Sequence, residues 1–485
     1  MSMLMPLARV KRLVKVAVAV AAGAALLAAC GSGSSSVPTT TSTAAASGPL
    51  RVTWMPGADA PGTPARYDRV GVIKVGPATA RNVLVLEPGT SAGSAYFVPL
   101  ARWIVSRTPG WQVWSVERRE NLLEDQSELT LAKQGKVTAI QLFDYYLGYL
   151  KDPAVTHHFQ TVPTSAVEFA KQWGMAVAVE DLHAVISAAR SLGGKVVLGG
   201  HSLGGAVVTA YATWDFGGHA GADGLAGLVY IDGGSFGTPI SAQSAQQSLT
   251  ALEAPSATPW LSFGGIPAPY AGLFIATGSL SALVAPDQPS PGQTSGLLPA
   301  GIVPPVRVTN AGQFGYALNA TTSPPDLAAA QAHLGEGLAA AGPVHGWNGS
   351  GALTPLERFA AMFAGAGITG VDGSEWYFPQ RLTDDSGAVA NGNANPAQTV
   401  LGLDATEGHH LPKDLLIYAF GAHLGGARVT QAAQQLAAQS GIPAGNLVLE
   451  DYQSTYSHND PAGAYPDNAF VTHLLPFLDR ISAGA

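Results

Sequence analysis

The sequence predicts an α/β fold, in which helices cover both faces of a mostly parallel β-sheet and one large insertion interrupts the scaffold. Short apolar runs alternate with helical patterns from about residue 50 to residue 232, as strands buried between two helical layers require. The alternation resumes at about residue 414 and continues to the carboxyl end. The segment between these parts is rich in Pro, Gly, Ser and Ala and has no sustained periodicity.

The amino-terminal segment has the pattern of an export signal. A basic stretch up to Lys15 precedes an apolar run, Val16–Ala29, which is short and Ala-rich beside the roughly 20 strongly apolar residues of a membrane-spanning helix. The run ends in Leu-Ala-Ala-Cys30, which resembles the lipobox of bacterial lipoproteins, and Cys30 is the only cysteine. We expect residues 1–30 to be a lipoprotein signal peptide, with lipidated Cys30 anchoring the protein to the cell envelope. The alternative is an ordinary signal peptide with a chance cysteine.

Composition limits the partners and sets the domain boundaries. Apart from Val37 and Pro38, residues 31–48 are Ser, Thr, Ala and Gly without periodicity, which predicts a flexible linker. The net charge is -8, 12% of residues are charged, and no basic cluster follows the signal segment, which argues against a nucleic-acid partner. We expect residues 49–232 and 414–485 to form the core, with residues 233–413 as a cap inserted over its active site.

The first part of the core is expected to supply six strands and three helices. The strands follow short apolar runs, and the helices follow the 3.6-residue apolar repeat. The expected strands are Arg51–Trp54, Gly71–Val75, Val83–Leu86, Trp111–Val116, Lys195–Leu198 and Gly227–Ile231. The expected helices are Tyr96–Ser106, Ala166–Leu192 and Leu203–Trp214.

The insertion gives weaker signals of secondary structure than the second part of the core. Within the insertion only Asp326–Leu338 and Pro355–Phe363 have helical patterns. After it we expect strands at Leu415–Phe420 and Asn446–Tyr452 and helices at Leu424–Gln439 and Asn468–Ile481. Several large apolar residues of the insertion could line an acyl-binding cleft or form the cap's own small core: Trp260, Phe263, Tyr270, Leu273 and Phe274.

The sharpest motif is Gly199-Gly200-His201-Ser202-Leu203-Gly204-Gly205, between an expected strand and an expected helix. In a G-x-S-x-G turn of this kind the serine lies on a strained strand-to-helix bend, and the glycines allow the close backbone approach that exposes its hydroxyl. The helix amino terminus behind Ser202 presents free N–H groups to a developing oxyanion. The motif therefore predicts that Ser202 is a nucleophile.

Here the chain resembles the α/β-hydrolase family, and within it the secreted esterases and lipases that carry the same G-H-S-L-G-G sequence. The resemblance covers about Arg51 to Asp232 and Leu415 to the end; the middle matches no family pattern. It implies a Ser-His-Asp acyl-enzyme mechanism, with the histidine after the last strand and an acid after an earlier one.

His458 is expected to be the base. It lies in Tyr456-Ser457-His458-Asn459-Asp460, between the last expected strand and the closing helix, where a loop histidine can take the serine proton and return it to the leaving group. Three other histidines fit less well. His473 lies within the closing helix, His201 is the variable residue of the Ser202 motif, and His423 follows the preceding strand.

The acid departs from the commonest pattern of the family. The next-to-last strand runs into Phe420-Gly-Ala-His-Leu-Gly-Gly426, which has no carboxylate, whereas the strand before the insertion ends in Asp232. Some lipases of this fold use the earlier position, so Asp232 is expected to orient His458. Asp232 could instead cap a turn, and Glu450, Asp451 and Asp467 are the alternatives.

The oxyanion hole should combine the backbone N–H of Leu203 with one from the loop Pro88-Gly89-Thr90, where Thr90 is the expected second donor. Ser91, Ser94 and Tyr96 could line the same pocket or cap the following helix. His409, His410, Asp404 and Glu407 lack a zinc-type spacing, so we expect no metal there. No phosphate-binding or dinucleotide-binding motif occurs in the sequence, and no cofactor is expected.

The function that this resemblance implies is hydrolysis of a small-molecule or lipid ester outside the cytoplasm. Three alternatives stay open. A serine peptidase or amidase would use the same triad on amides, and an acyltransferase would favour an alcohol over water as acceptor. A surface-binding protein without activity is the third, because a fold does not imply a function.

Overall fold

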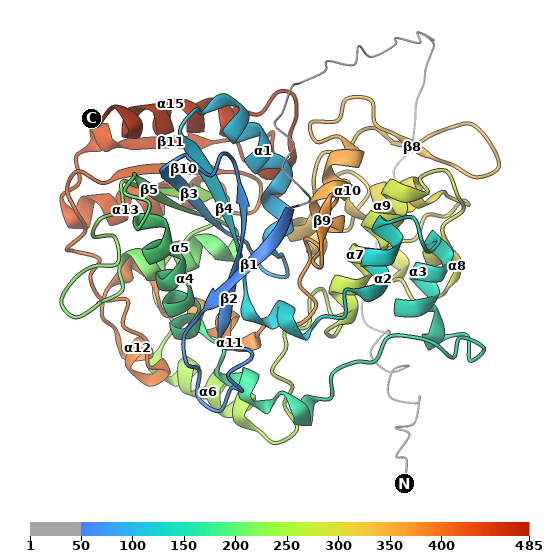
Figure 1. The fold of residues 1–485 in the computed structure, drawn as a ribbon, viewed down its shortest axis with the longest axis horizontal. Coiled ribbons are helices and arrows are strands. Elements are labelled where there is room, and N and C mark those ends of the chain that lie inside the picture. The colour runs from blue at the N-terminus through green and yellow to red at the C-terminus, as the bar shows by residue number, and fades with distance from the viewer. Residues whose placement is uncertain (1–49, 485) are drawn as a thin grey trace. The chain divides into compact units, whose positions relative to one another are not determined.

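The computed structural model describes residues 50–484. This part of the chain has an α/β-hydrolase fold, with a nine-stranded sheet in the order β11-β10-β6-β5-β3-β4-β2-β1-β9 (Figure 1). The predicted fold class is confirmed. The expected signal peptide, Cys30 and the linker up to residue 48 lie outside the described residues.

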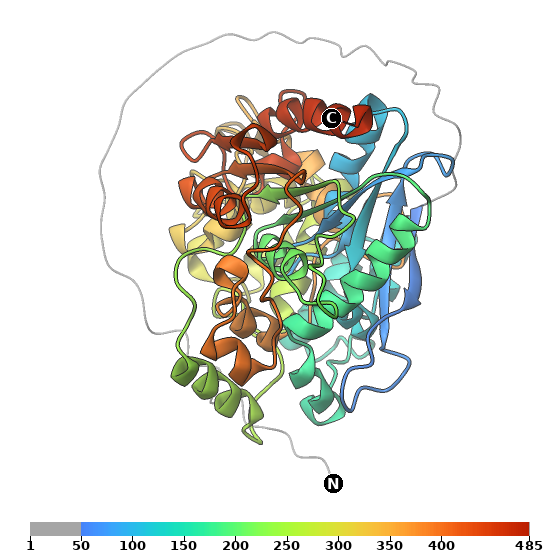
Figure 2. The same cartoon turned by 90° about the vertical axis from the view of Figure 1, so that its left-hand side faces the viewer.

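The sheet is parallel except where β2 pairs with β1 and with β4. All eight predicted strands occur, and the short edge strand β9 was not predicted. The strands are β1 (Leu50–Pro56), β2 (Arg69–Val75), β3 (Asn82–Glu87), β4 (Trp111–Glu117), β5 (Val196–His201), β6 (Gly227–Ile231), β9 (Ile368–Thr369), β10 (Leu416–Gly421) and β11 (Leu447–Asp451). The amino-terminal strands and the carboxyl-terminal elements lie toward opposite edges of the sheet (Figure 2).

Two helical layers cover the sheet because successive strand side chains point to opposite faces. In β3, Leu84 and Leu86 pack into the apolar cluster under α1 (Val98–Arg107) and α15 (Ala469–Ala483). Val83 and Val85 pack into the other cluster, which lies under α4 (Met175–Arg190), α5 (Leu203–Ala212) and α13 (Ala427–Ser440).

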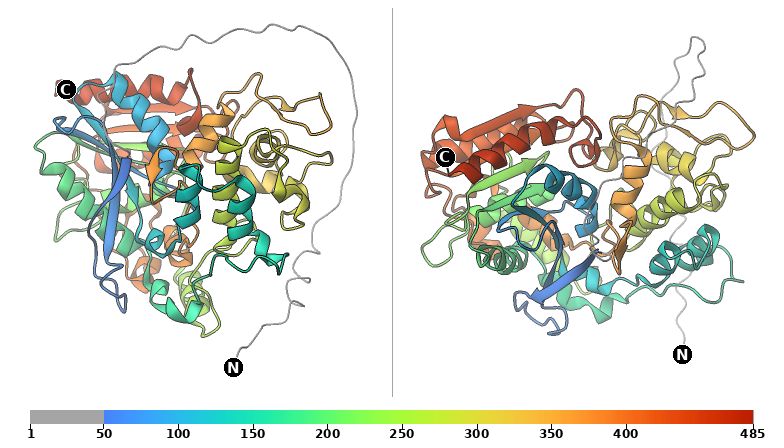
Figure 3. Two further views of the ribbon diagram at one scale, coloured as in Figure 1. Left: turned by 45° about the vertical axis from the view of Figure 1, so that its right-hand side comes forward. Right: turned by 45° about the horizontal axis from the view of Figure 1, so that its top comes forward.

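A group of helices beside one end of the sheet combines two separate parts of the sequence. It contains α2 (Ser127–Lys133), α3 (Ala139–Tyr146), α7 (Tyr270–Val284), α8 (Pro291–Thr294), α9 (Asn310–Leu318) and α10 (Leu356–Ala364). Both views of Figure 3 show α2 and α3 beside the helices of the insertion. We call this group the cap; the part formed by α2 and α3 was not expected from the sequence.

Other parts of residues 233–413 lie elsewhere. α11 (Gln380–Ser386) packs against α4 and α5, and α6 (Ala242–Glu253) packs against α11 and α12 (Pro396–Leu401). β9 extends the sheet next to β1. The insertion therefore contributes to the core faces as well as to the cap.

The prediction of a helix over Asp326–Leu338 is wrong. A 3-10 turn covers Pro325–Ala330, and the chain then runs extended into a hairpin of β7 (Gly337–Leu338) and β8 (Trp347–Asn348). Gly335 and Gly337 have φ values of 129° and 125°, which a right-handed helix does not contain. The helix expected from Ala166 begins only at Met175, after 3-10 turns. Within residues 50–484, none of the helices combines the length and apolar composition needed to span a bilayer.

Candidate active site

Ser202 lies at a sharp bend between β5 and α5. Its backbone has φ 57° and ψ -126°, a conformation that residues other than glycine rarely adopt. The bend fits because its neighbours are glycines: a Cβ on Gly200 would overlap the backbone of Gly204, and one on Gly205 would overlap Gly233. The strand, bend and helix around Ser202 thus have the geometry that the motif predicted.

His458 and Asp232 form a buried hydrogen bond. The Nδ1 atom of His458 donates to Oδ2 of Asp232 at 2.6 Å, and the two residues are 1% and 2% exposed. Asp232 follows β6 directly, and its carboxylate also accepts hydrogen bonds from the backbone N–H groups of Ala422, Leu424 and Gly425. The loop after β10 has no carboxylate of its own, but its backbone N–H groups hold the carboxylate of Asp232.

The charge state of Asp232 follows from these contacts. Burial acts to raise the pKa of its carboxyl, but the hydrogen bond and charge of His458 and the N–H groups of Ala422 and Gly425 outweigh burial, and the pKa is lowered. Asp232 is therefore ionised at neutral pH, and the His458 proton stays on Nδ1. Nε2 of His458 is then free to accept a proton.

His201 contacts His458 through a hydrogen bond and ring packing. Its Nε2 donates to the His458 carbonyl oxygen at 2.9 Å, and the two ring centroids are 4.4 Å apart. Tyr96 stacks on His201, with ring centroids 5.3 Å apart. Burial, and then the charge of His458, lower the pKa of His201 to about 3, so His201 is neutral and adds no repulsion to a protonated His458.

Ser202 and His458 line one cavity of about 170 Å³. Tyr96, Phe263 and Ile275 also line it. Within residues 50–484 no hydrogen bond joins the Ser202 hydroxyl to His458 in this structure. Such bonds are often long or misaligned without substrate.

A second cavity, of about 330 Å³, also borders Ser202. The two cavities share Thr90, Ser202 and Leu424. Phe236 and Arg428 line the second cavity, whereas His458 lines the first. Ser202 therefore borders two cavities with different linings.

The two residues predicted to supply the oxyanion donors line these cavities. Leu203 is the first residue of α5 and lines the second cavity, and Thr90 lines both cavities. Among the described residues no acceptor is bonded to the backbone N–H of Thr90. Gly89 packs so closely on Ser202 that a Cβ there would overlap the serine side chain, so the loop before Thr90 lies directly against the Ser202 bend.

Arg118 holds that loop in place, a role that the sequence did not reveal. Its guanidinium donates to the carbonyl oxygens of Pro88, Gly89 and Ala92 at 2.8 to 2.9 Å. It also pairs with Glu87 at 2.7 Å and with Glu375 of the insertion at 2.6 Å. An arginine directly after a buried strand was the only signal in the sequence.

The other candidates from the sequence lie away from Ser202 or have other partners. His473 pairs with Glu450 at 3.2 Å, His410 pairs with Glu407, and His423 is exposed. Among the described residues no group of three metal-ligating side chains comes together. The large apolar residues of the insertion divide between the two roles that the sequence left open: Phe263 lines the cavity at Ser202, whereas Trp260 and Leu273 are buried in the cap core.

No protein-family model and no curated protein sequence matches this chain. Solved structures resemble it distantly. A monoglyceride lipase from Saccharomyces cerevisiae is 12% identical, with 90% of this chain and 96% of that chain covered and a TM-score of 0.38. A carboxyl esterase from Bacillus coagulans is 12% identical, with 90% and 100% covered and a TM-score of 0.39.

A proline iminopeptidase-related protein from Thermus thermophilus is 14% identical, with 90% and 99% covered and a TM-score of 0.36. These likenesses concern the fold alone. The α/β-hydrolase fold of this chain is given by its strand order and by the bend at Ser202.

Proposed function

We propose that this protein is a serine hydrolase that cleaves carboxylic esters through an acyl-enzyme. The observation that carries the proposal is the joint placement of three side chains. Ser202, on its strained bend, shares a cavity with His458, and His458 is held at 2.6 Å by the ionised Asp232.

In the proposed reaction His458 takes the Ser202 proton as the serine oxygen attacks the substrate carbonyl. The resulting imidazolium is stabilised by Asp232 and gives its proton to the leaving alcohol. A water molecule, deprotonated by His458, then releases the acid. Negative charge on the carbonyl oxygen develops beside the N–H groups of Thr90 and Leu203, where fixed donors stabilise it without reorganisation.

The lining of the two cavities favours an ester with apolar arms. Phe263, Ile275 and Phe363 line the cavity beside His458, and Phe236 and Leu424 line the other. Burying apolar surface contributes about 25 cal/mol per Å², so arms of this kind gain more here than charged ones. The following test also distinguishes an esterase from a peptidase, an acyltransferase and a protein without catalytic activity.

The test is hydrolysis of p-nitrophenyl esters of increasing acyl length by the full chain in mild detergent, beside its Ser202→Ala variant. Ser191→Ala is the matched control, because Ser191 is exposed and distant in the fold from the bend. Turnover by the wild type and the control, lost in Ser202→Ala, supports the proposal. Faster cleavage of a matched p-nitroanilide would favour a peptidase. Ester products formed from an added alcohol would favour an acyltransferase, and no turnover at all would favour a binding protein.

We also propose that Cys30 carries lipid and anchors the domain outside the cytoplasmic membrane. The lipobox-like sequence supports this. Labelled palmitate incorporated by a bacterial host into the wild type, and lost in Cys30→Ser, is the expected result. Labelling that persists in Cys30→Ser would contradict it.

A further inference from the structure

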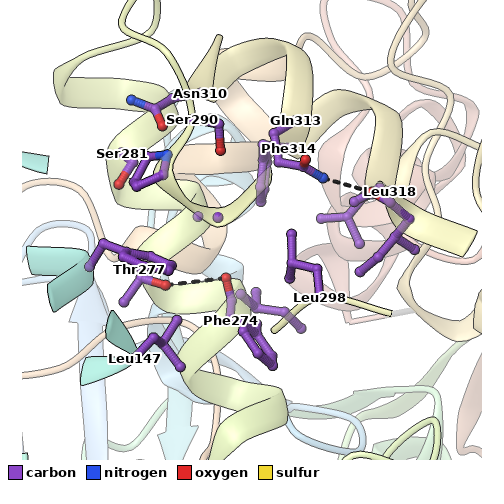
Figure 4. A pocket seen from close by; sticks show the side chains of 17 residues that line it. Leu147, Phe274, Thr277, Ser281, Ser290, Leu298, Asn310, Gln313, Phe314 and Leu318 are labelled. Atoms are coloured by element: carbon purple, nitrogen blue, oxygen red, sulfur yellow. Dashed lines mark hydrogen bonds between the residues drawn. The ribbon is translucent and has the colours of Figure 1, made fainter. Parts of the chain in front are cut away.

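The cap contains a third cavity, of about 100 Å³, between α7 and α9. Figure 4 shows side chains from both helices around it, with Phe274 and Thr277 from α7 and Gln313 and Phe314 from α9. Its walls are mainly apolar, and an apolar cavity of ~150 Å³ in another protein takes up benzene. A short alkyl chain or a small ring is therefore the kind of group that fits.

Ile275 borders both this cavity and the active-site cavity. The same side chain lines the cap cavity and the cavity that contains Ser202 and His458. The two cavities therefore adjoin at Ile275 of α7. The cap cavity is thus placed to receive the far end of one arm of a substrate.

The position of His458 decides which arm that is. His458 must deliver its proton to the oxygen of the leaving alcohol, so the alcohol arm lies on the side that His458 lines. His458 lines the cavity that borders Ile275, and it does not line the cavity of Phe236 and Arg428. The acyl arm is left with the second cavity.

Gln313 adds a polar requirement. Its Nε2 donates to the Ile302 carbonyl oxygen at 2.7 Å, which fixes the orientation of the amide. Gln313 is 7% exposed, and within residues 50–484 its Oε1 has no hydrogen-bond donor. A buried acceptor without a partner is costly, and a hydroxyl on a group bound in the cavity would satisfy it.

We propose that the cap cavity binds the far end of an apolar alcohol arm of the ester, and that Gln313 accepts a hydrogen bond from a second hydroxyl on that arm. This rests on the proposed ester hydrolysis. The substrate class is then a monoester of a medium-chain diol or a similar amphipathic alcohol.

Gly278→Leu tests the apolar part. A Cβ at Gly278 meets only Phe314, at an ordinary 3.6 Å, so the larger side chain fills the cavity without overlapping the backbone. Each methylene in an apolar pocket changes kcat/KM by ~10-fold or more. For the full chain, the ratio of kcat/KM for hexyl acetate to that for ethyl acetate should fall at least ~10-fold. Gly346→Leu, a change in the insertion with open space around it, should keep the wild-type ratio.

An unchanged ratio in Gly278→Leu would overturn the inference while leaving ester hydrolysis intact. So would an effect confined to the acyl series of p-nitrophenyl esters, because that places the acyl arm in the cap. For Gln313, the preference for 6-hydroxyhexyl acetate over hexyl acetate should fall about fivefold in Gln313→Met, as expected for one neutral hydrogen bond. An equal preference in both proteins would remove Gln313 from recognition.

Binding of hexan-1-ol separates this inference from the proposed function, since it needs no turnover. In Ser202→Ala the alcohol should raise the midpoint of thermal unfolding, and the added Gly278→Leu change should abolish the shift. A shift that survives Gly278→Leu would overturn the site. Absence of turnover with every ester would overturn the proposed function, and hexan-1-ol would then decide alone whether the cavity takes an apolar alcohol.

Discussion

The Nη2 atom of Arg118 lies 2.8 Å from the carbonyl oxygen of Gly89, the residue whose backbone packs against Ser202. Arg118 is 6% exposed and makes two more bonds to the same loop, through Pro88 and Ala92. Its guanidinium thus fixes three carbonyl groups around Thr90. The direction of the Thr90 N–H depends on this arginine, which itself does not line either cavity at Ser202.

Arg118→Lys should lower kcat by about 10-fold to 100-fold with a smaller change in KM, because an ammonium group cannot hold three carbonyls at once and a ~1 Å shift of a catalytic donor costs this much. Arg119→Lys is the control, since Arg119 is equally buried and pairs with Asp181 and Asp68 instead. Both variants should lose stability in urea unfolding. Equal losses of kcat in the two variants would show that Arg118 acts on stability alone.

Ser202→Gly should be more stable than Ser202→Ala by about 1 kcal/mol. Ser202 has φ 57°, a conformation that costs a residue with a Cβ roughly 1–3 kcal/mol and glycine much less, and the larger entropy of unfolded glycine offsets part of the gain. Urea unfolding of the two inactive variants measures the difference. If Ser202→Gly is the less stable, the bend stores no strain.

Glu117 should make stability fall as pH rises from about 4.5 to about 7. Burial raises the pKa of its carboxyl to about 7, against the hydrogen bonds from Ser94 and Asn121. Since the folded state binds this proton more tightly than the unfolded state, the stabilisation is complete below pH 4.5 and is lost as pH rises through 7.

Glu117→Gln removes this dependence. The new amide can accept from the Ser94 N–H, and it can donate to Asn121 Oδ1 once the Asn121 amide, whose Nδ2 now faces Glu117, turns over. Relative to the wild type the variant should gain about 3 kcal/mol between pH 4.5 and pH 8, measured by urea unfolding at each pH. Glu180→Gln, at an exposed position, should track the wild type; an identical pH profile for Glu117→Gln would contradict the prediction.

The sequence predicted the core strands and the bend at Ser202 because both depend on local patterns. A short apolar run between turn residues identifies a buried strand, and glycines around a serine identify the bend. The position of His458 followed from the order of the elements. Its bond to Asp232 joins residues that are 226 positions apart, and spacing alone left Glu450, Asp451 and Asp467 as alternatives.

The cap could not be predicted in the same way. α7 is apolar nearly all round, from Tyr270 to Val284, so it lacks the one-sided repeat by which a helix is recognised. α2 and α3 pack against it from a distant part of the chain. The role of Arg118 has no local signal either, since its partners come from the β3 loop and from Glu375.

Asp460 connects the loop that contains His458 to the insertion through hydrogen bonds. Its carboxylate accepts hydrogen bonds from the Ser457 N–H at 2.7 Å, from the His333 N–H at 3.0 Å and from the Thr354 hydroxyl at 2.6 Å. The His333 ring also bonds to it at 2.6 Å. An asparagine here must place its NH2 group against one of the two backbone donors. We therefore expect Asp460→Asn to lower kcat about 10-fold and to cost roughly 1–3 kcal/mol.

Thr354→Val is the control for Asp460→Asn, because it removes one bond to the carboxylate and leaves the donor from Ser457 in place. A pH series adds a second readout. The hydrogen bond and charge of Asp460 raise the pKa of His333, so the wild type gains stability below about pH 6.5 that disappears as pH rises through the folded pKa. The stability difference between the wild type and Asp460→Asn should thus be larger at pH 5 than at pH 8. A constant difference, or an equal loss of kcat in Thr354→Val, would mean that Asp460 does not position His458 in this way.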